Sequence, residues 1–113
     1  MTTILFRIDD NTVFTSFTPV AEPIGEPLSM TRTALETETE DALLGVWECT
    51  PGKWRRQVLQ AEYSYFLSGQ GRFLHDNGEI TVFKAGDGIF FPANSTGIWE
   101  IEHTVRKSYV IFK

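Results

Sequence analysis

The dipeptide Asn77-Gly78 constrains the fold of this chain more than any other feature, because it lies between two segments rich in strand-forming residues, 72–75 and 80–84. A two-residue type I′ turn needs positive φ at both central positions, and Asn-Gly meets that requirement at little cost. The sequence therefore predicts a tight β-hairpin here. Gly-Asp-Gly at 86–88 and Pro92 predict the next two corners, with a short strand between them.

Further short strands are expected on both sides of this hairpin, and no segment has the periodicity of an amphipathic helix. The expected strands are 31–36, 43–50, 54–59, 62–68, 72–75, 80–84, 89–91, 97–101 and 107–112. Many short strands at close spacing predict an all-β jelly-roll barrel over residues 31–113. Residues 1–30 contain three prolines after Phe17, which exclude a helix or a central strand there. We expect an extended N-terminal arm packed on the barrel or on a partner.

Composition excludes several classes of function. The 113 residues carry a net charge of −5, and basic residues occur only in short groups such as 53–56 and 106–107. No basic stripe for nucleic acid is therefore present. No apolar run approaches the length of a membrane span or a secretion signal, so we expect a cytoplasmic protein with no membrane partner. The one cysteine, Cys49, cannot form a disulfide within the chain, and with two histidines it gives no Cys/His zinc site.

An ordered set of motifs over residues 40–113 resembles the RmlC-like cupin superfamily. The motifs are GVWECTPG at 45–52, Glu62 with Gly69, Gly86-Asp87 with Pro92-Ala-Asn94, GIWE at 97–100, and RKSYV at 106–110. Within the superfamily the chain is similar to small single-domain cupins related to the cupin domain of (S)-ureidoglycine aminohydrolase. This resemblance implies a double-stranded β-helix, which is the cupin form of the jelly roll, and often a homodimer. It implies no single activity.

The resemblance also implies where a metal would bind. Cupins that hold one use two histidines and a glutamate from the first motif and a third histidine from the second. In this sequence those positions fall on Arg56, Val58, Glu62 and Gly97. One carboxylate cannot hold a transition metal tightly, because such sites need three or four donors. We therefore expect no metal and no cofactor. Ureidoglycine hydrolysis, which in that family relies on a metal and a second cupin domain, is not expected either.

Strand alternation converts this register into a predicted lumen, because side chains two apart on a strand share a face. The residues expected to face a ligand there are Trp54, Arg56, Glu62, Ser64, Phe66 and Trp99, with Tyr109 if its strand turns it inward. Arg56 and Glu62 are the candidate catalytic residues. They either form a structural ion pair or act as a clamp. In the clamp, Arg56 would bind a ligand carboxylate and Glu62 would orient or deprotonate the ligand.

Three functions are compatible with these residues. The first is a metal-free cupin that binds a small organic metabolite in its lumen. The second is a metal-independent isomerase, epimerase or hydrolase that uses Glu62 as acid or base and Arg56 to stabilise charge. The third is a structural or interaction module with an inert barrel. Tyr63, Tyr65 and Leu67 would share the outer face of their strand. Either the arm or a second copy must cover them, and we expect a homodimer.

Overall fold

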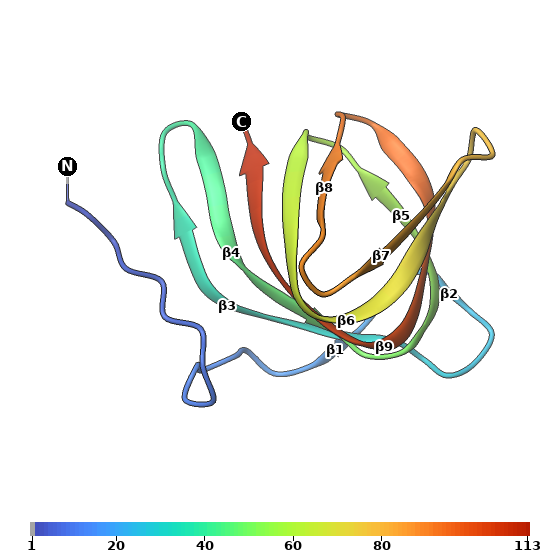
Figure 1. The fold of residues 1–113 in the computed structure, drawn as a ribbon, viewed down its shortest axis with the longest axis horizontal. Helices are drawn as coiled ribbons and strands as arrows, with labels where there is room; N and C mark the ends of the chain where they lie inside the picture. The colour runs from blue at the N-terminus through green and yellow to red at the C-terminus, as the bar shows by residue number, and fades with distance from the viewer. Residues whose placement is uncertain (1) are drawn as a thin grey trace.

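The computed structural model describes residues 2–113, and over that range it contains strands but no helix, hence no helix that could span a membrane. The strands are β1 (Thr18–Pro19), β2 (Pro23–Ile24), β3 (Met30–Glu38), β4 (Ala42–Cys49), β5 (Gly52–Val58), β6 (Glu62–His75), β7 (Ile80–Lys84), β8 (Gly88–Phe91) and β9 (Ser95–Phe112). They form one antiparallel sheet that curls into a half-barrel (Figure 1). The predicted all-β fold is confirmed.

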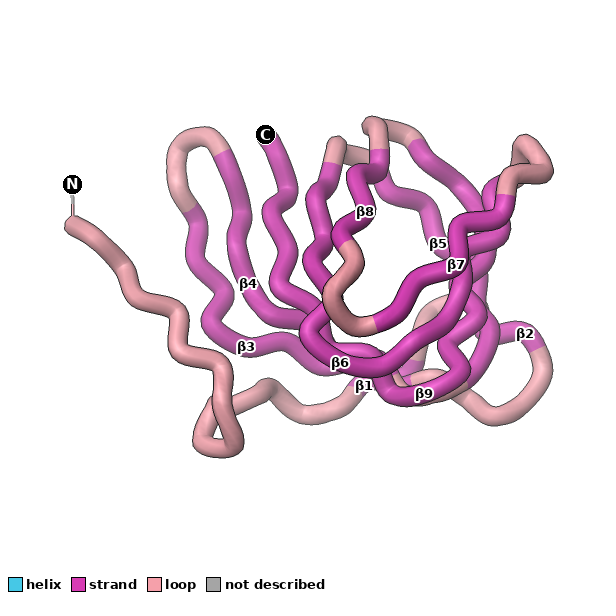
Figure 2. The backbone as a smooth tube through the Cα atoms, viewed as in Figure 1, coloured by secondary structure: helices cyan, strands magenta, loops and turns pink. Residues whose placement is uncertain are grey.

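Two long strands, β6 and β9, organise the sheet. β9 pairs with β5 through its first part and with β4 through its last, and it pairs with β6 along most of its length. On its other edge β6 pairs with β8 and then with β7. The pairing of β6 with β9 shifts register around Gly69, whose φ is +86°. A side chain at this position would collide with the backbone of Thr104. Figure 2 shows both strands bending together beneath the half-barrel.

The hairpin at Asn77-Gly78 is confirmed, but its predicted turn type is wrong. β6 ends at His75 and β7 begins at Ile80, which leaves residues 76–79 between them. Gly78 has a φ of +95°, whereas Asn77 is not among the described residues with positive φ. The Asn77 side chain instead accepts a hydrogen bond from the amide of Glu79 at 2.9 Å. This local bond stabilises a longer turn in which only the glycine is left-handed.

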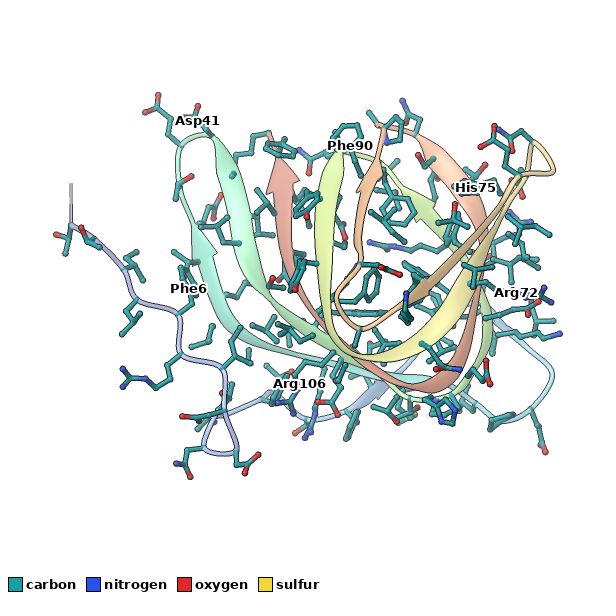
Figure 3. All side chains as sticks on the ribbon, in the orientation of Figure 1. Phe6, Asp41, Arg72, His75, Phe90 and Arg106 are labelled. Carbon is teal, nitrogen blue, oxygen red and sulfur yellow. The ribbon has the colours of Figure 1, made fainter. Side chains whose placement is uncertain are left out.

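The N-terminal arm docks on the outer face of β3, β4 and β9. Glu48 of β4 accepts hydrogen bonds at 3.0 Å from Arg32 of β3 and from Arg106 of β9, which lies beside the arm in Figure 3. The guanidinium of Arg32 lies 4.4 Å from the centroid of the Phe14 ring, a cation–π contact that fixes the arm. Within the arm, β1 and β2 pair with β3 and β5 as edge strands, where proline is tolerated.

Aromatic side chains fill the closed side of the half-barrel around Trp99, which is 2% exposed. Its indole meets rings from four other strands, at centroid distances from 4.9 to 6.4 Å and mostly edge to face. The rings are those of Trp47, Phe66, Phe73, Phe83 and Phe91. Offset and edge-on packing of this kind adds to the free energy gained from buried area. Trp99 is therefore the centre of the core.

Trp99→Ala is expected to lower the free energy of unfolding by about 3–5 kcal/mol, because it opens a cavity that neighbouring rings cannot refill. Ile80→Ala is the control, since Ile80 is 56% exposed and its truncation should cost about 0.5 kcal/mol or less. Urea unfolding followed by circular dichroism measures both. Equal losses in the two variants would contradict the central place of Trp99.

Candidate functional site

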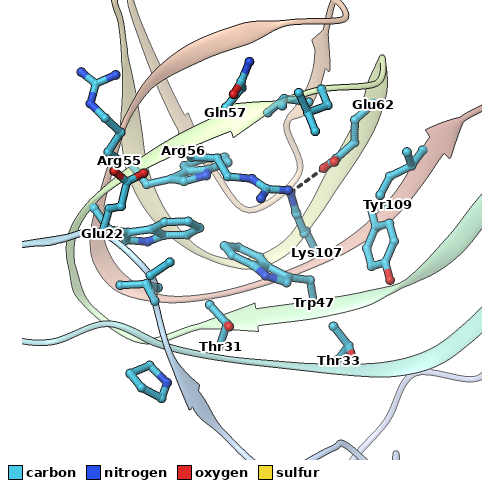
Figure 4. A pocket seen from close by; sticks show the side chains of 18 residues that line it. Glu22, Thr31, Thr33, Trp47, Arg55, Arg56, Gln57, Glu62, Lys107 and Tyr109 are labelled. Carbon is cyan, nitrogen blue, oxygen red and sulfur yellow. Dashed lines mark hydrogen bonds and ion pairs between the residues drawn. The ribbon is translucent and has the colours of Figure 1, made fainter.

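A cavity of about 520 Å³ lies on the concave face of the half-barrel (Figure 4). Its lining includes the chain's three tryptophans and six polar or charged side chains that matter below: Thr31, Thr33, Arg56, Glu62, Lys107 and Tyr109. Residues 19–22 of the arm form part of the wall. The site thus draws on the arm and on β3, β4, β5, β6 and β9, so it exists only in the folded chain.

Lys107 lies at the centre of this site and is almost fully buried. Its ammonium Nζ donates hydrogen bonds to Glu62 Oε2 at 2.8 Å and to Ser64 Oγ at 3.0 Å. The Ser64 hydroxyl in turn donates to the same carboxylate oxygen at 2.9 Å. The rings of Trp47 and Trp99 lie 4.6 and 5.3 Å from Nζ. The Lys107 ammonium therefore belongs to a closed triangle of polar groups and lies beside two indole rings, which favour a cation.

Burial and charge act in opposite directions on this pair. Burial alone would raise the pKa of Glu62, but the charge and hydrogen bond of Lys107, with the hydrogen bond from Ser64, outweigh it and hold that pKa below its usual value. For Lys107 burial is the largest influence and lowers the pKa of the amine, while the attraction of Glu62 partly opposes it. The positive charge of Arg56 lowers both pKa values further.

Arg56 does not form the ion pair with Glu62 that the sequence offered as one alternative. The carboxylate of Glu62 is occupied by Lys107, and no hydrogen bond or ion pair holds the Arg56 side chain within the described part of the chain. The neighbouring Arg55 differs, because it makes two hydrogen bonds of 3.0 Å to Asp76. Figure 4 shows Arg56 reaching into the cavity beside Lys107. A cavity guanidinium is therefore available to a ligand.

Tyr109 faces the cavity on β9, two residues from Lys107 and on the same side of the strand. Gly45 is its register partner on β4, and any side chain at Gly45 would collide with the Tyr109 ring. Burial, followed by the charges of Glu36 and Glu62, raises the pKa of Tyr109 to about 12. The phenol is therefore neutral at physiological pH and can donate a hydrogen bond.

The other predicted lumen residues divide into two groups. Trp54 and Trp99 line the cavity together, as register partners on β5 and β9. Ser64 is fully buried behind the wall and holds Lys107 and Glu62 rather than facing the cavity. Phe66 is not part of the lining, because its ring stacks on Phe83 at 4.1 Å in the core.

Sequence reasoning missed Lys107 and Trp47, although a signal for Lys107 was present. Lys107 is two residues before Tyr109, and side chains two apart share a face, so the assignment that turns Tyr109 inward also turns Lys107 inward. A lysine in a strand is usually taken as exposed, because burying its charge without a partner is costly. The partner, Glu62, comes from a strand distant in sequence.

The residues at the positions of a cupin metal site do not fit a metal. Among the described residues no cluster of three or more His, Cys, Asp or Glu side chains exists. Glu62, the one carboxylate at a ligand position, is engaged by an ammonium. At Gly97 a side chain would collide with the carbonyl of Leu74 and the ring of Phe73. The place of one ligand is therefore filled by packing, and no step of a reaction can be assigned to a metal here.

Comparisons with known proteins place the chain among cupins. Residues 36–109 match the family model for the EutQ-like cupin domain. The EutQ protein of Clostridium difficile superposes with a TM-score of 0.67 at 18% identity, covering 81% of this chain and 76% of that protein. The polyketide cyclase RemF of Streptomyces resistomycificus gives a TM-score of 0.66 at 20% identity, over 96% of this chain and 80% of that one.

A protein of the DUF861 family from Thermotoga maritima is also similar in structure. It superposes with a TM-score of 0.58 at 27% identity, covering 59% of this chain and 76% of that protein. Identities of 18% and 20%, as for EutQ and RemF, show a common fold and nothing finer. No curated protein matches the sequence. A specific resemblance to ureidoglycine aminohydrolase is not shown by these comparisons, whereas membership of the cupin superfamily is.

Glu62→Gln is expected to lower the free energy of unfolding at pH 7 by about 3–5 kcal/mol, because it leaves the charge of Lys107 buried without a partner. The double variant Glu62→Leu, Lys107→Met removes both charges and should recover most of that loss. Urea unfolding followed by circular dichroism gives both values. A Glu62→Gln protein as stable as wild type would contradict the pairing.

The same comparison has a defined pH dependence. The folded-state pKa of Glu62 lies below its unfolded value, so the unfolded chain takes up this proton first as the pH falls. The advantage of wild type over Glu62→Gln is therefore fully present above the usual carboxyl pKa and is lost as the pH falls through the lowered folded value. Unfolding curves measured from neutral to acid pH should converge; a constant difference would contradict the assignment.

Proposed function

The chain belongs to the EutQ-like cupin domain family, and from this premise we propose that it binds a small organic acid, without a metal, in the cavity of its half-barrel. The observation that carries the proposal is the Arg56 guanidinium, which lines the cavity and has no partner among the described residues. Guanidinium binds a carboxylate through two parallel hydrogen bonds, which gives both affinity and orientation.

The rest of the cavity supports an organic ligand with an apolar or flat body. Its volume of about 520 Å³ lies within the range usual for small-molecule sites. Trp47 and Trp54 line it with indole surface, and the hydroxyls of Thr31 and Thr33 add a few polar contacts. A carboxylate on Arg56 and a ring or chain against the tryptophans would use both kinds of surface.

The two alternative functions receive less support. An inert barrel would be expected to have a full lumen, and this one is not full. Glu62 acting alone as a general base is disfavoured, because Lys107 holds its pKa below the usual range and a weak base accepts protons poorly near neutral pH. A metal-independent enzyme would therefore need Lys107 as well, a role that the sequence did not suggest.

Arg56→Gln is expected to weaken binding of the organic acid about tenfold or more, because a charged hydrogen bond contributes about 1.5–3 kcal/mol. A thermal-shift screen of aromatic and aliphatic carboxylic acids, each beside its primary amide, would identify the ligand, and calorimetry would give its affinity. We expect acids to bind and amides to fail.

Arg7→Gln is the matched control, since it removes the same charge from an exposed position in the arm. It should leave binding unchanged. Binding of acids and amides with equal affinity, or an Arg56→Gln variant with wild-type affinity, would refute recognition of a carboxylate by Arg56.

We also propose that a second copy of the chain covers the outer face of β6. Tyr63 pairs in register with Phe90 of β8 and Val110 of β9, and Val110 pairs with Leu44 of β4, so one row of apolar side chains crosses four strands. Tyr63 is 41% exposed and Phe90 58%. Phe14 of the arm packs on Arg32, and the arm leaves Tyr63 and Phe90 exposed. Large apolar patches usually mark contacts, and a twofold dimer is the commonest closed assembly.

Tyr63→Lys is expected to convert a dimer into a monomer, because it places a charge in the middle of the row. Light scattering coupled to size-exclusion chromatography measures the mass, and one chain is 12.8 kDa. Val82→Lys is the control, since Val82 is 74% exposed on β7, outside the row. A monomeric wild type at high protein concentration would refute this proposal.

A further inference from the structure

The proposed function leaves the most unusual group in the cavity without a role. Lys107 has a side chain only 6% exposed, whereas those of Lys53, Lys84 and Lys113 are 55%, 75% and 36% exposed. Taking an ammonium and a carboxylate out of water costs several kcal/mol for each ion, and a buried pair often contributes no net stability. A well-packed apolar pair would serve the fold as well.

From this geometry we propose that Lys107 is a reactive amine, and that the cavity takes a 2-oxo acid whose carbonyl carbon forms an imine with Lys107 Nζ while its carboxylate binds Arg56. The inference rests on the proposed function for the carboxylate. It adds the second group that defines the ligand class: a carbonyl directly beside the acid.

Three observations support the amine as the second contact. Lys107 lines the same cavity as Arg56, and Figure 4 shows both side chains reaching into it. A 2-oxo acid carries its carbonyl one bond from its carboxylate, so neighbouring cations suit it. Burial lowers the pKa of Lys107, which makes the neutral amine easier to reach. The indole surface beside Nζ excludes water, which would otherwise return an imine to its ketone.

Glu62 supplies the proton transfers. The Glu62 carboxylate, 2.8 Å from Nζ, takes one proton from the ammonium. The nitrogen lone pair then forms a C–N bond, and the carbonyl oxygen takes that proton back from Glu62 to become a hydroxyl. A second N–H proton passes to Glu62 and returns to this hydroxyl, which leaves as water while the C–O bond breaks. A final proton retained on nitrogen leaves a protonated imine.

The protonated imine formed by these steps suits the same surroundings as the Lys107 ammonium. Ammonium plus ketone gives protonated imine plus water, so the nitrogen carries one positive charge before and after. Glu62 is again a carboxylate, with a cation still beside it. The rings of Trp47 and Trp99, 4.6 and 5.3 Å from Nζ, still face a cation. Imine formation therefore does not leave a buried charge unpaired.

The test is reductive trapping on the full chain. The protein is incubated with pyruvate or phenylpyruvate and borohydride, which reduces an imine to a stable amine, and the modified residue is located by peptide mass mapping. We expect one adduct per chain on Lys107, ahead of the more exposed Lys53, Lys84 and Lys113, and loss of most of it in Arg56→Gln. If only exposed lysines were labelled, the proposal would be overturned. This outcome is read from the wild-type protein alone, so it does not depend on whether a variant folds.

The 2-hydroxy acid phenyllactate separates this inference from the proposed function, because it offers the carboxylate without the carbonyl. Binding of phenyllactate that depends on Arg56, with no adduct on Lys107, would overturn the imine and leave the acid site standing. If none of the three acids bound and no adduct formed with pyruvate or phenylpyruvate, both the imine and the acid site would be overturned. Glu62→Leu, Lys107→Met, which removes both buried charges together, should lose the adduct and keep its fold by circular dichroism. An adduct that persists in this variant would also overturn the assignment.

Discussion

The pairing of β6 with β9 is the interaction on which the rest of this structure depends. It joins the two longest strands over most of their length and bends both around Gly69. The same register sets Ser64 against Tyr109 and Phe66 against Lys107, which brings Lys107 to Glu62. A slip by one residue would turn every side chain of a strand to the opposite face. The core and the candidate site are therefore specified by one set of backbone hydrogen bonds.

The concave face divides into a filled part and an open part. Around Trp99, rings from four other strands interlock and leave little space. Phe73 even occupies the space that a side chain at Gly97 would need. Towards β3 and β4 the sheet instead borders a cavity, whose lining includes the Lys107–Glu62 pair and Arg56, which has no partner among the described residues. Of the positions compared with a cupin metal site, Gly97 is closed off by packing and Glu62 is engaged in an ion pair.

The two faces of the sheet can serve separate purposes because alternate residues point in opposite directions. On β6, Glu62 and Ser64 face inward, while Tyr63 and Tyr65 face outward. Substitutions at adjacent positions can therefore change the concave face and the outer face independently. The N-terminal arm contacts both faces of the sheet. Its Phe14 packs on Arg32 on the outer face, and its residues 19–22 border the cavity on the concave face.

The sequence by itself determined the fold class, the hairpin at Asn77-Gly78 and the positions of Trp54, Arg56, Glu62 and Trp99 on the concave wall. Turn chemistry and strand alternation are local properties, and the resemblance to cupin motifs supplied the register. It could not choose the turn type, which depended on an Asn77 contact with Glu79. Nor could it pair Glu62 correctly. Strand alternation can turn both Arg56 and Lys107 towards Glu62. Lys107 is 45 residues from Glu62 in the sequence, and only the pairing of β6 with β9 decided that it reaches the carboxylate. Long-range register is a tertiary property, and it left Arg56 without a partner among the residues that the structure describes.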